Sequence, residues 1–164
     1  MRVHCEVSTR GTTPMNKAFC REPDSSAPPR CPGCGHDGAQ VAPDTVRAHV
    51  AASSAEVLGE PAFYCGHDSC AVAYFDLLER SVAVVEARDL PWPKDPRGPL
   101  CACHGLSVAE AEADAVAGSP ARVREVIRRA SLLDAECATR SADGRTCVAR
   151  VQTYYLRRRA ELGG

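Results

Sequence analysis

Aromatic residues and long apolar runs are scarce in this chain. Aromatics make up 5% of the 164 residues, so we expect a core that is thin for the length of the chain. No stretch approaches the 18 consecutive apolar residues of a membrane-spanning helix. The N-terminus, around His4 and Cys5, has no apolar core region and is therefore not a secretory signal. We expect no membrane insertion.

Motifs of ordinary catalysis are also missing. The chain has no P-loop, no dinucleotide fingerprint and no plausible Ser/His/Asp set, so we expect no enzyme, one-electron reduction of a metal ion being the sole activity left open. The net charge is only −1, although ten arginines and five acids lie between residues 120 and 164. Few aromatics are available for base stacking, so a nucleic-acid partner is not favoured.

Cysteine, by contrast, is abundant, with ten residues in the chain. Closely spaced cysteines without an export signal indicate metal ligands in the reducing cytoplasm rather than disulfides. Because the core is thin, bound metal is the expected source of additional stability.

The first group of cysteines has the spacing of a zinc site. Cys31-Pro-Gly-Cys34-Gly is a tight knuckle, and Cys65-Gly-His-Asp-Ser-Cys70 is its partner thirty residues later. We predict that Cys31, Cys34, Cys65 and Cys70 bind Zn²⁺. His67 is the alternative ligand within the second loop, either replacing a cysteine or orienting one, but four cysteines already complete the set. The expected strands are residues 62–64, 71–75 and 82–85, with 46–50 as a further candidate.

The second group runs from Cys101 to Cys147 as C-x-C, a gap of 33 residues, and C-x9-C. Ser107 and Glu110 form a capping box for one helix, and Ser119-Pro120 predicts the N-cap and first residue of a second. A third apolar repeat starts after Cys147. A helical hairpin would bring the four thiols together next to helix N-termini, which suit an anionic iron–sulfur cluster. We predict a [2Fe–2S] cluster on Cys101, Cys103, Cys137 and Cys147, with zinc as the alternative.

These residues resemble the N-terminal region of the archaeal-type CopZ copper chaperones. Their C-P-x-C-G and C-x4-C-x-V-x-Y-F motifs correspond to residues 31–35 and 65–75, and their C-x-C, helix–turn–helix and final cysteines correspond to residues 101–147. The resemblance spans residues 31 to about 152. It implies a zinc ribbon followed by a [2Fe–2S] module similar to bacterioferritin-associated ferredoxin. Thr139 and Val148 stand where the family often has further cysteines, and no G-x-x-C-x-x-C copper loop follows Cys147.

The expected fold class is therefore α+β, with a small β-rich module preceding a helical one. Residues 1–30, which contain Cys5, Cys20 and the alternative start Met15, are expected to be a disordered leader. Residues 31–90 form the zinc module, 91–100 a stiff proline-rich linker, and 101–164 the helical cluster module with its C-terminal helix. Trp92 in the linker is expected to pack between the modules.

Two functions fit these expectations. The first is a cytoplasmic electron carrier or metallochaperone accessory that handles copper or another thiophilic metal together with a protein redox or metal-transfer partner. The second is a non-redox adaptor with two zinc sites that binds a protein or nucleic acid. The C-x-C and C-x9-C spacing favours the first, because zinc ligands are usually drawn from C-x2-4-C knuckles.

Overall fold

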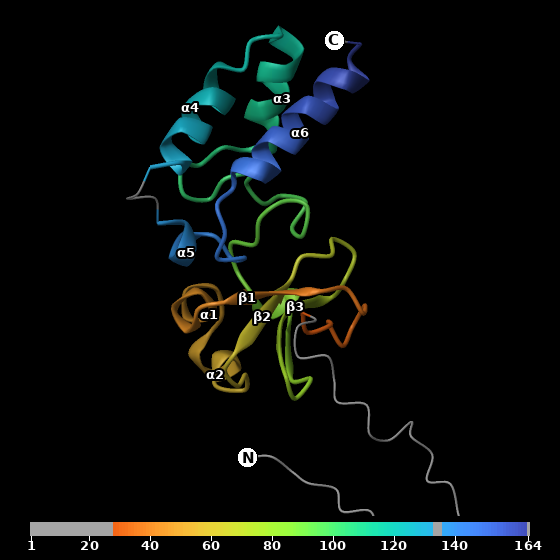
Figure 1. The fold of residues 1–164 in the computed structure, drawn as a ribbon, viewed down its shortest axis with the longest axis vertical. Coiled ribbons are helices and arrows are strands. Elements are labelled where there is room, and N and C mark those ends of the chain that lie inside the picture. Colours follow the sequence, from red (N-terminus) through yellow and green to blue (C-terminus); the bar gives the residue numbers. More distant parts are fainter. Residues whose placement is uncertain (1–27, 133–135, 164) are drawn as a thin grey trace, which may run out of the picture.

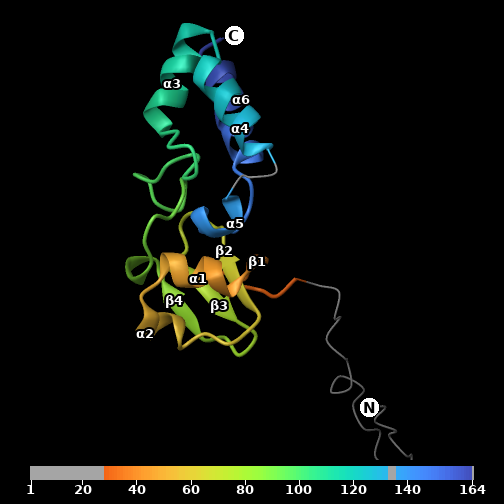
Figure 2. The same ribbon diagram turned by 90° about the vertical axis from the view of Figure 1, so that its left-hand side faces the viewer.

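The computed structural model describes residues 28–132 and 136–163, which form two stacked parts (Figure 1). One part contains a β-sheet with two short helices, and the other contains three longer helices. The views in Figure 1 and Figure 2 agree that a short helix, α5 (Cys137–Arg140), lies between them. Most of the expected leader, with Cys5, Met15 and Cys20, lies outside the described residues. No helix among those described is long and apolar enough to cross a membrane.

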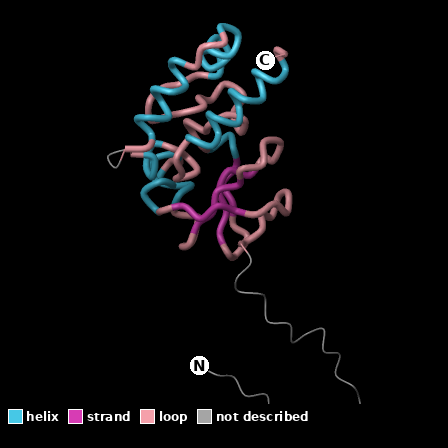
Figure 3. Tube along the Cα trace, turned by 45° about the horizontal axis from the view of Figure 1, so that its top comes forward, coloured by secondary structure: helices cyan, strands magenta, loops and turns pink. Residues whose placement is uncertain are grey.

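The sheet has four strands in the order β1-β2-β3-β4, all antiparallel to their neighbours. Figure 3 shows the strands in magenta, gathered in one part of the molecule. The strands are β1 (Gly38–Val41), β2 (Ala62–Cys65), β3 (Val72–Asp76) and β4 (Ser81–Ala83). The expected strand over residues 82–85 is only partly right, because Val84–Glu86 form a 3-10 helix. β1 was not expected at all, since the Gly-Ala-Gln-Val segment has little apolar alternation.

The expectation of a strand at residues 46–50 is wrong. This segment belongs to helix α1 (Pro43–His49), which is followed by α2 (Ala52–Ala55). Pro43 takes the first turn, where its missing N–H costs nothing, and Asp44 places a carboxylate near the helix N-terminus. These two helix-start signals outweigh the β propensity of Val46 and Val50. Val46 is buried against the sheet together with Tyr64 and Tyr74.

The helical part consists of α3 (Val108–Ala117), α4 (Ala121–Ala130) and α6 (Val148–Glu161). Ser107 and Glu110 form the expected capping box. Ser119 does not cap α4, because the buried Asp114 accepts hydrogen bonds from the backbone N–H groups of Arg122 (2.8 Å) and Val123 (3.0 Å) instead. The helices share one core, which includes Leu100, Leu106, Ala111, Val123, Val151 and Tyr154.

The segment around α5 contacts the sheet part closely. Thr45 donates a hydrogen bond to the carbonyl of Ala138, and Tyr74 donates one of 2.7 Å to the carbonyl of Ala142. His49, which is 3% exposed, lies 3.1 Å from the carbonyl of Thr139 through Nε2. Residues 138–142 are thus folded onto the sheet part, in addition to the covalent link through residues 91–100.

Candidate metal centres

Cys31, Cys34, Cys65 and Cys70 converge at one end of the sheet. The first two come from the loop before β1, Cys65 ends β2, and Cys70 precedes β3. Their four sulfurs all lie within 4.8 Å of one another, with Cys31–Cys70 at 3.8 Å and Cys34–Cys65 at 3.6 Å. Tetrahedral Zn–S bonds of about 2.3 Å require sulfurs about 3.8 Å apart. The arrangement fits a zinc ion without rearrangement.

Each of these sulfurs accepts a backbone hydrogen bond from the residue two positions further on. The donors are the N–H groups of Gly33, His36, His67 and Val72. Such donors stabilise thiolates, as expected of a tight metal knuckle. A Cβ at Gly33 would lie 2.9 Å from Val72 Cγ2 and 3.1 Å from Cys70 Sγ, so glycine is what allows the two loops to approach.

The thiols of this group are not equivalent. Burial raises the pKa of Cys31, and it raises that of Cys65 to about 12. Burial also acts against the thiolate of Cys34, but the N–H of His36 and the neighbouring thiols lower its pKa to about 6. Cys34 is therefore the ready thiolate of the site, and a metal ion must displace protons from Cys31 and Cys65.

Lys94 is a component of this centre that the spacing of cysteines does not reveal. It comes from the proline-rich linker and is 5% exposed, with Nζ donating to the carbonyls of His67 (2.8 Å) and Cys70 (2.7 Å). Its charge offsets a small part of the burial effect that raises the pKa of Cys65. Four thiolates around Zn²⁺ carry a net charge of −2, which a buried ammonium offsets. The available signal in the sequence was that Lys94 is one of two lysines in a chain that otherwise uses arginine.

The second group of cysteines lies at the junction of the helices. Cys101 and Cys103 are in the turn before α3, Cys137 starts α5, and Cys147 is the N-cap of α6. They form two pairs: Cys103 Sγ is 3.7 Å from Cys137 Sγ, and Cys101 is hydrogen-bonded to Cys147. Among the described residues, no three of these four sulfurs lie within 4.8 Å of one another, unlike those of the zinc group.

Three thiols of this second group have shifted pKa values. The hydrogen bond from Cys147 lowers the pKa of Cys101 to about 6, and the same bond raises that of Cys147. Burial and the contact with Cys137 raise the pKa of Cys103 to about 12. Cys101, Cys137 and Cys147 are buried, whereas Cys103 is half-buried. Cys103 is therefore the side of this centre closest to solvent.

Sequence reasoning assigned no role to His36 and a loop position to His67. In the structure their rings are stacked, with centroids 3.9 Å apart and planes 21° apart. Their nitrogens, together with Cys34 Sγ, lie within 4.8 Å of one another. The available sequence signal was the Cys-Gly-His triplet, which occurs in both zinc loops.

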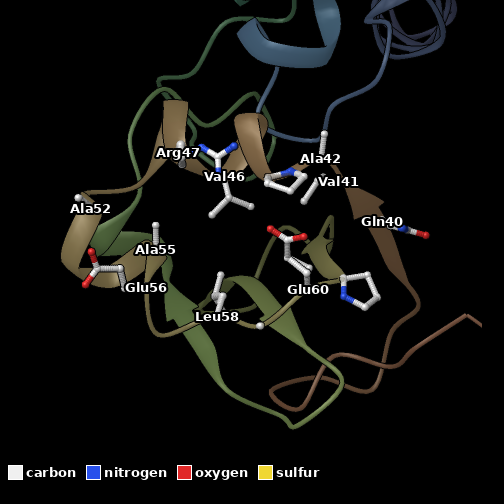
Figure 4. Close-up of a pocket in the computed structure, with 14 residues that line it drawn as sticks. Gln40, Val41, Ala42, Val46, Arg47, Ala52, Ala55, Glu56, Leu58 and Glu60 are labelled. Carbon is white, nitrogen blue, oxygen red and sulfur yellow. The ribbon is translucent and has the colours of Figure 1, made fainter.

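A groove in the sheet part is lined by residues other than the eight candidate ligands. It opens between α1, α2 and the β1–β2 edge, where Val46 and Leu58 are among its lining residues (Figure 4). Arg47, Glu56 and Glu60 supply its charged side chains. No cysteine or histidine lines it, so it contributes nothing to a metal centre.

Comparison with known proteins agrees with the zinc assignment. Residues 28–88 match the zf_CopZ family model, described as a zinc binding domain. The X-ray structure of the Archaeoglobus fulgidus CopZ N-terminal domain is similar over 76% of this chain and 96% of that chain, with a TM-score of 0.65 and 23% identity. No curated protein matches the chain. Residues 28–88 thus form a CopZ-like, zinc-binding ribbon, and the α+β fold is shared with that structure beyond the ribbon.

Proposed function

We propose that this chain is a cytoplasmic zinc and [2Fe–2S] protein that carries single electrons, or assists a metallochaperone, in the handling of copper or another thiophilic metal. In this proposal zinc is structural, and the helical part is similar to bacterioferritin-associated ferredoxin. A redox or metal-transfer protein is the expected partner. A bound [2Fe–2S] cluster supplies one-electron chemistry.

The observation that supports the cluster most directly is the grouping of the sulfurs. A single zinc ion needs all four within one small tetrahedron, as at Cys31, Cys34, Cys65 and Cys70. The second group instead forms two pairs of sulfurs, and a [2Fe–2S] cluster needs two cysteines for each of its two irons. Cys103 and Cys137 would bind one iron, and Cys101 and Cys147 the other.

The surroundings of these cysteines suit an anionic centre. Cys101 accepts hydrogen bonds from the backbone N–H groups of Cys103 and His104, and Cys147 occupies the N-terminus of the 14-residue helix α6. Burial raises the pKa of Cys103, and the positive charge of Arg140 offsets a small part of that effect. Because Cys103 is half-buried and the other three cysteines are buried, the shortest electron-transfer path to a partner protein would pass through Cys103.

The adaptor alternative has less support in the surface charges. Several arginines of the C-terminal half are paired with acids: Arg128 and Arg129 contact Glu125, and Arg158 contacts Glu112 and Glu161. Paired arginines contribute less to a phosphate-binding surface than free ones.

Anaerobic purification with metal and sulfide analysis tests the cluster. We expect two irons, two sulfides and one zinc per chain, a reddish-brown colour, and an electron paramagnetic resonance signal after one-electron reduction. Cys103→Ala should abolish the colour and leave one zinc. A colourless protein with two zincs and no sulfide would establish the adaptor reading.

Reduction of copper tests the role. The chemically reduced protein, freed of reductant, is mixed with one equivalent of Cu²⁺ and a chelator specific for Cu⁺. One electron should pass from the cluster to the copper, so the visible bands of the oxidised cluster should return as one equivalent of Cu⁺ is captured. If the cluster stays reduced, or breaks down without yielding Cu⁺, the copper-reducing role fails, and a general ferredoxin-like or iron-release role is favoured instead.

A further inference from the structure

The two zinc loops repeat the same three residues. Cys34-Gly35-His36 follows the first knuckle, and Cys65-Gly66-His67 opens the second. Because the loops face each other across the site, the repeat brings the two imidazoles into contact, with ring centroids 3.9 Å apart. Zinc uses four cysteines, which leaves this pair of histidines without a role in the first site.

The histidines and one zinc ligand form a compact set of donors. The ligand atoms of Cys34, His36 and His67 all lie within 4.8 Å of one another. Cys34 is the half-buried sulfur of the zinc group, whereas Cys31, Cys65 and Cys70 are buried. His36 is exposed and His67 half-buried, so an ion from solvent can reach this side of the site.

Both histidines are held in place through their backbones. The N–H of Cys31 donates to the carbonyl of His36 at 2.8 Å, and the buried Nζ of Lys94 donates to that of His67 at 2.8 Å. The ring of His67 makes only a long hydrogen bond, in which Nδ1 lies 3.4 Å from Ser69 Oγ. The ring of His36 hydrogen-bonds to Cys34 Sγ, another of the three donors, so a metal ion bound between them would replace that contact.

We propose that Cys34, His36 and His67 form a second metal site, in which a thiophilic d10 ion lies beside the zinc and shares the sulfur of Cys34. A zinc-bound thiolate keeps lone pairs and can bridge two ions. One thiolate and two imidazoles are donors that Cu⁺ and Zn²⁺ both accept. A second cation is also favoured by the net charge of −2 on zinc with four thiolates.

The zinc site and the proposed second site differ in how readily a bound ion would exchange with solvent, as well as in their ligands. The zinc is enclosed by three buried sulfurs, whereas the second ion would be held at the rim by the exposed His36 and the half-buried His67. The second ion would therefore exchange readily, next to a zinc ion that stays bound. Transfer of a metal ion to another carrier requires such an exchangeable site. This inference does not depend on a cluster at Cys101, Cys103, Cys137 and Cys147.

The test compares the full-length chain with the His36→Asn/His67→Asn double variant, both purified anaerobically with their first zinc. Each is titrated with Cu⁺, and separately with Zn²⁺, in competition with a chromophoric chelator. Asp68→Asn is the matched control, because it removes an exposed charge from the same loop and no donor. Ring signals of His36 and His67 are followed by nuclear magnetic resonance.

We expect the wild type and Asp68→Asn to bind one more equivalent of at least one ion, with shifts of both imidazole signals. The double variant should bind that equivalent at least 10-fold more weakly while retaining its first zinc. Equal binding of both ions by wild type and double variant would overturn the site, since other thiols would then account for the uptake. Loss of the first zinc from the double variant would also overturn it, because the histidines would then belong to the zinc site itself.

Discussion

Single side chains outside the cysteine motifs decide how well the zinc centre is held, and Lys94 is the strongest case. Its ammonium satisfies two buried carbonyls of the Cys65–Cys70 loop and offsets the charge of the thiolates. Groups that support metal ligands in this way typically contribute 10–100-fold in metal affinity. We predict that Lys94→Met weakens zinc binding by about 10-fold or more, as measured by competition with a chelator.

The matched control for Lys94 is Arg97→Met in the same linker, whose side chain is 94% exposed. It removes one positive charge without touching the loop, so the affinity for zinc should stay within about twofold. Equal losses in the two variants would mean that net charge, and not the buried hydrogen bonds of Lys94, determines the affinity.

Asp76, the last residue of β3, is a second single side chain that stabilises the sheet part, at the turn that leads to β4. Its side chain is 2% exposed, yet it accepts hydrogen bonds from the backbone of Gly59, Leu78 and Arg80 and from the Arg80 guanidinium. Burial alone would raise the pKa of this carboxyl, but these donors lower it below its usual 3.8. The stabilisation is therefore complete above pH 3.8 and is lost only as the pH falls through the lower, folded value.

We predict that Asp76→Asn lowers the free energy of unfolding by about 2 kcal/mol, because hydrogen bonds to a buried charge are lost. The loss should be the same at every pH from 6 to 8, as measured by urea unfolding with zinc present. Glu79→Gln, an exposed change in the same turn, should have little effect. A loss that varies across this range would require a second titrating partner.

At the level of elements, α5 depends on the sheet part for its position. His49 Nδ1 lies 3.0 Å from the carbonyl of Arg88, and Nε2 lies 3.1 Å from that of Thr139 in α5. The ring thus joins α1 to the segment that carries Cys137. We predict that His49→Leu shortens the lifetime of the cluster in air several-fold and leaves the zinc content unchanged, because it removes the polar ring contacts that join α1 to α5. Loss of cluster absorption with time is the measurement.

Arg47→Gln is the control for this contact. Arg47 is also in the last turn of α1, but its side chain is 62% exposed and contacts only Asp44 among the interactions described. Its cluster should decay at the wild-type rate. If both variants lose the cluster equally fast, the effect comes from a weakened α1 and not from the contact between His49 and α5.

The elements that local patterns specify could be predicted from the sequence, and those that depend on distant contacts could not. The capping box at Ser107 identified α3, because both partners lie within one turn. The N-cap of α4 was missed, since Asp114 supplies it from another helix. Likewise, cysteine spacing identified both sets of candidate ligands, while Lys94 reaches the zinc loop from 24 residues away from Cys70.

For the whole molecule, the contact between the two parts bears on whether the two metal centres depend on each other. A stiff linker favours modules that lose their metals independently, so that zinc loss would leave the cluster intact. The structure leads to another expectation. Residues 137–144 contact Thr45, His49 and Tyr74 of the zinc part, and they include one of the four thiols of the second centre.

We therefore predict that Cys34→Ser, which removes one of the four zinc ligands, also destabilises the cluster. Without zinc the ribbon buries too little apolar surface to stay folded, so α1 and β3 no longer support the segment around Cys137. The measurement is visible circular dichroism of the anaerobically purified variant with iron analysis, in which we expect at least half of the cluster signal to be lost. Cys5→Ser, which removes a thiol outside the described residues, should retain the full signal. A Cys34→Ser protein with an unfolded ribbon and an unchanged cluster would show that residues 101–163 hold the cluster without the zinc part.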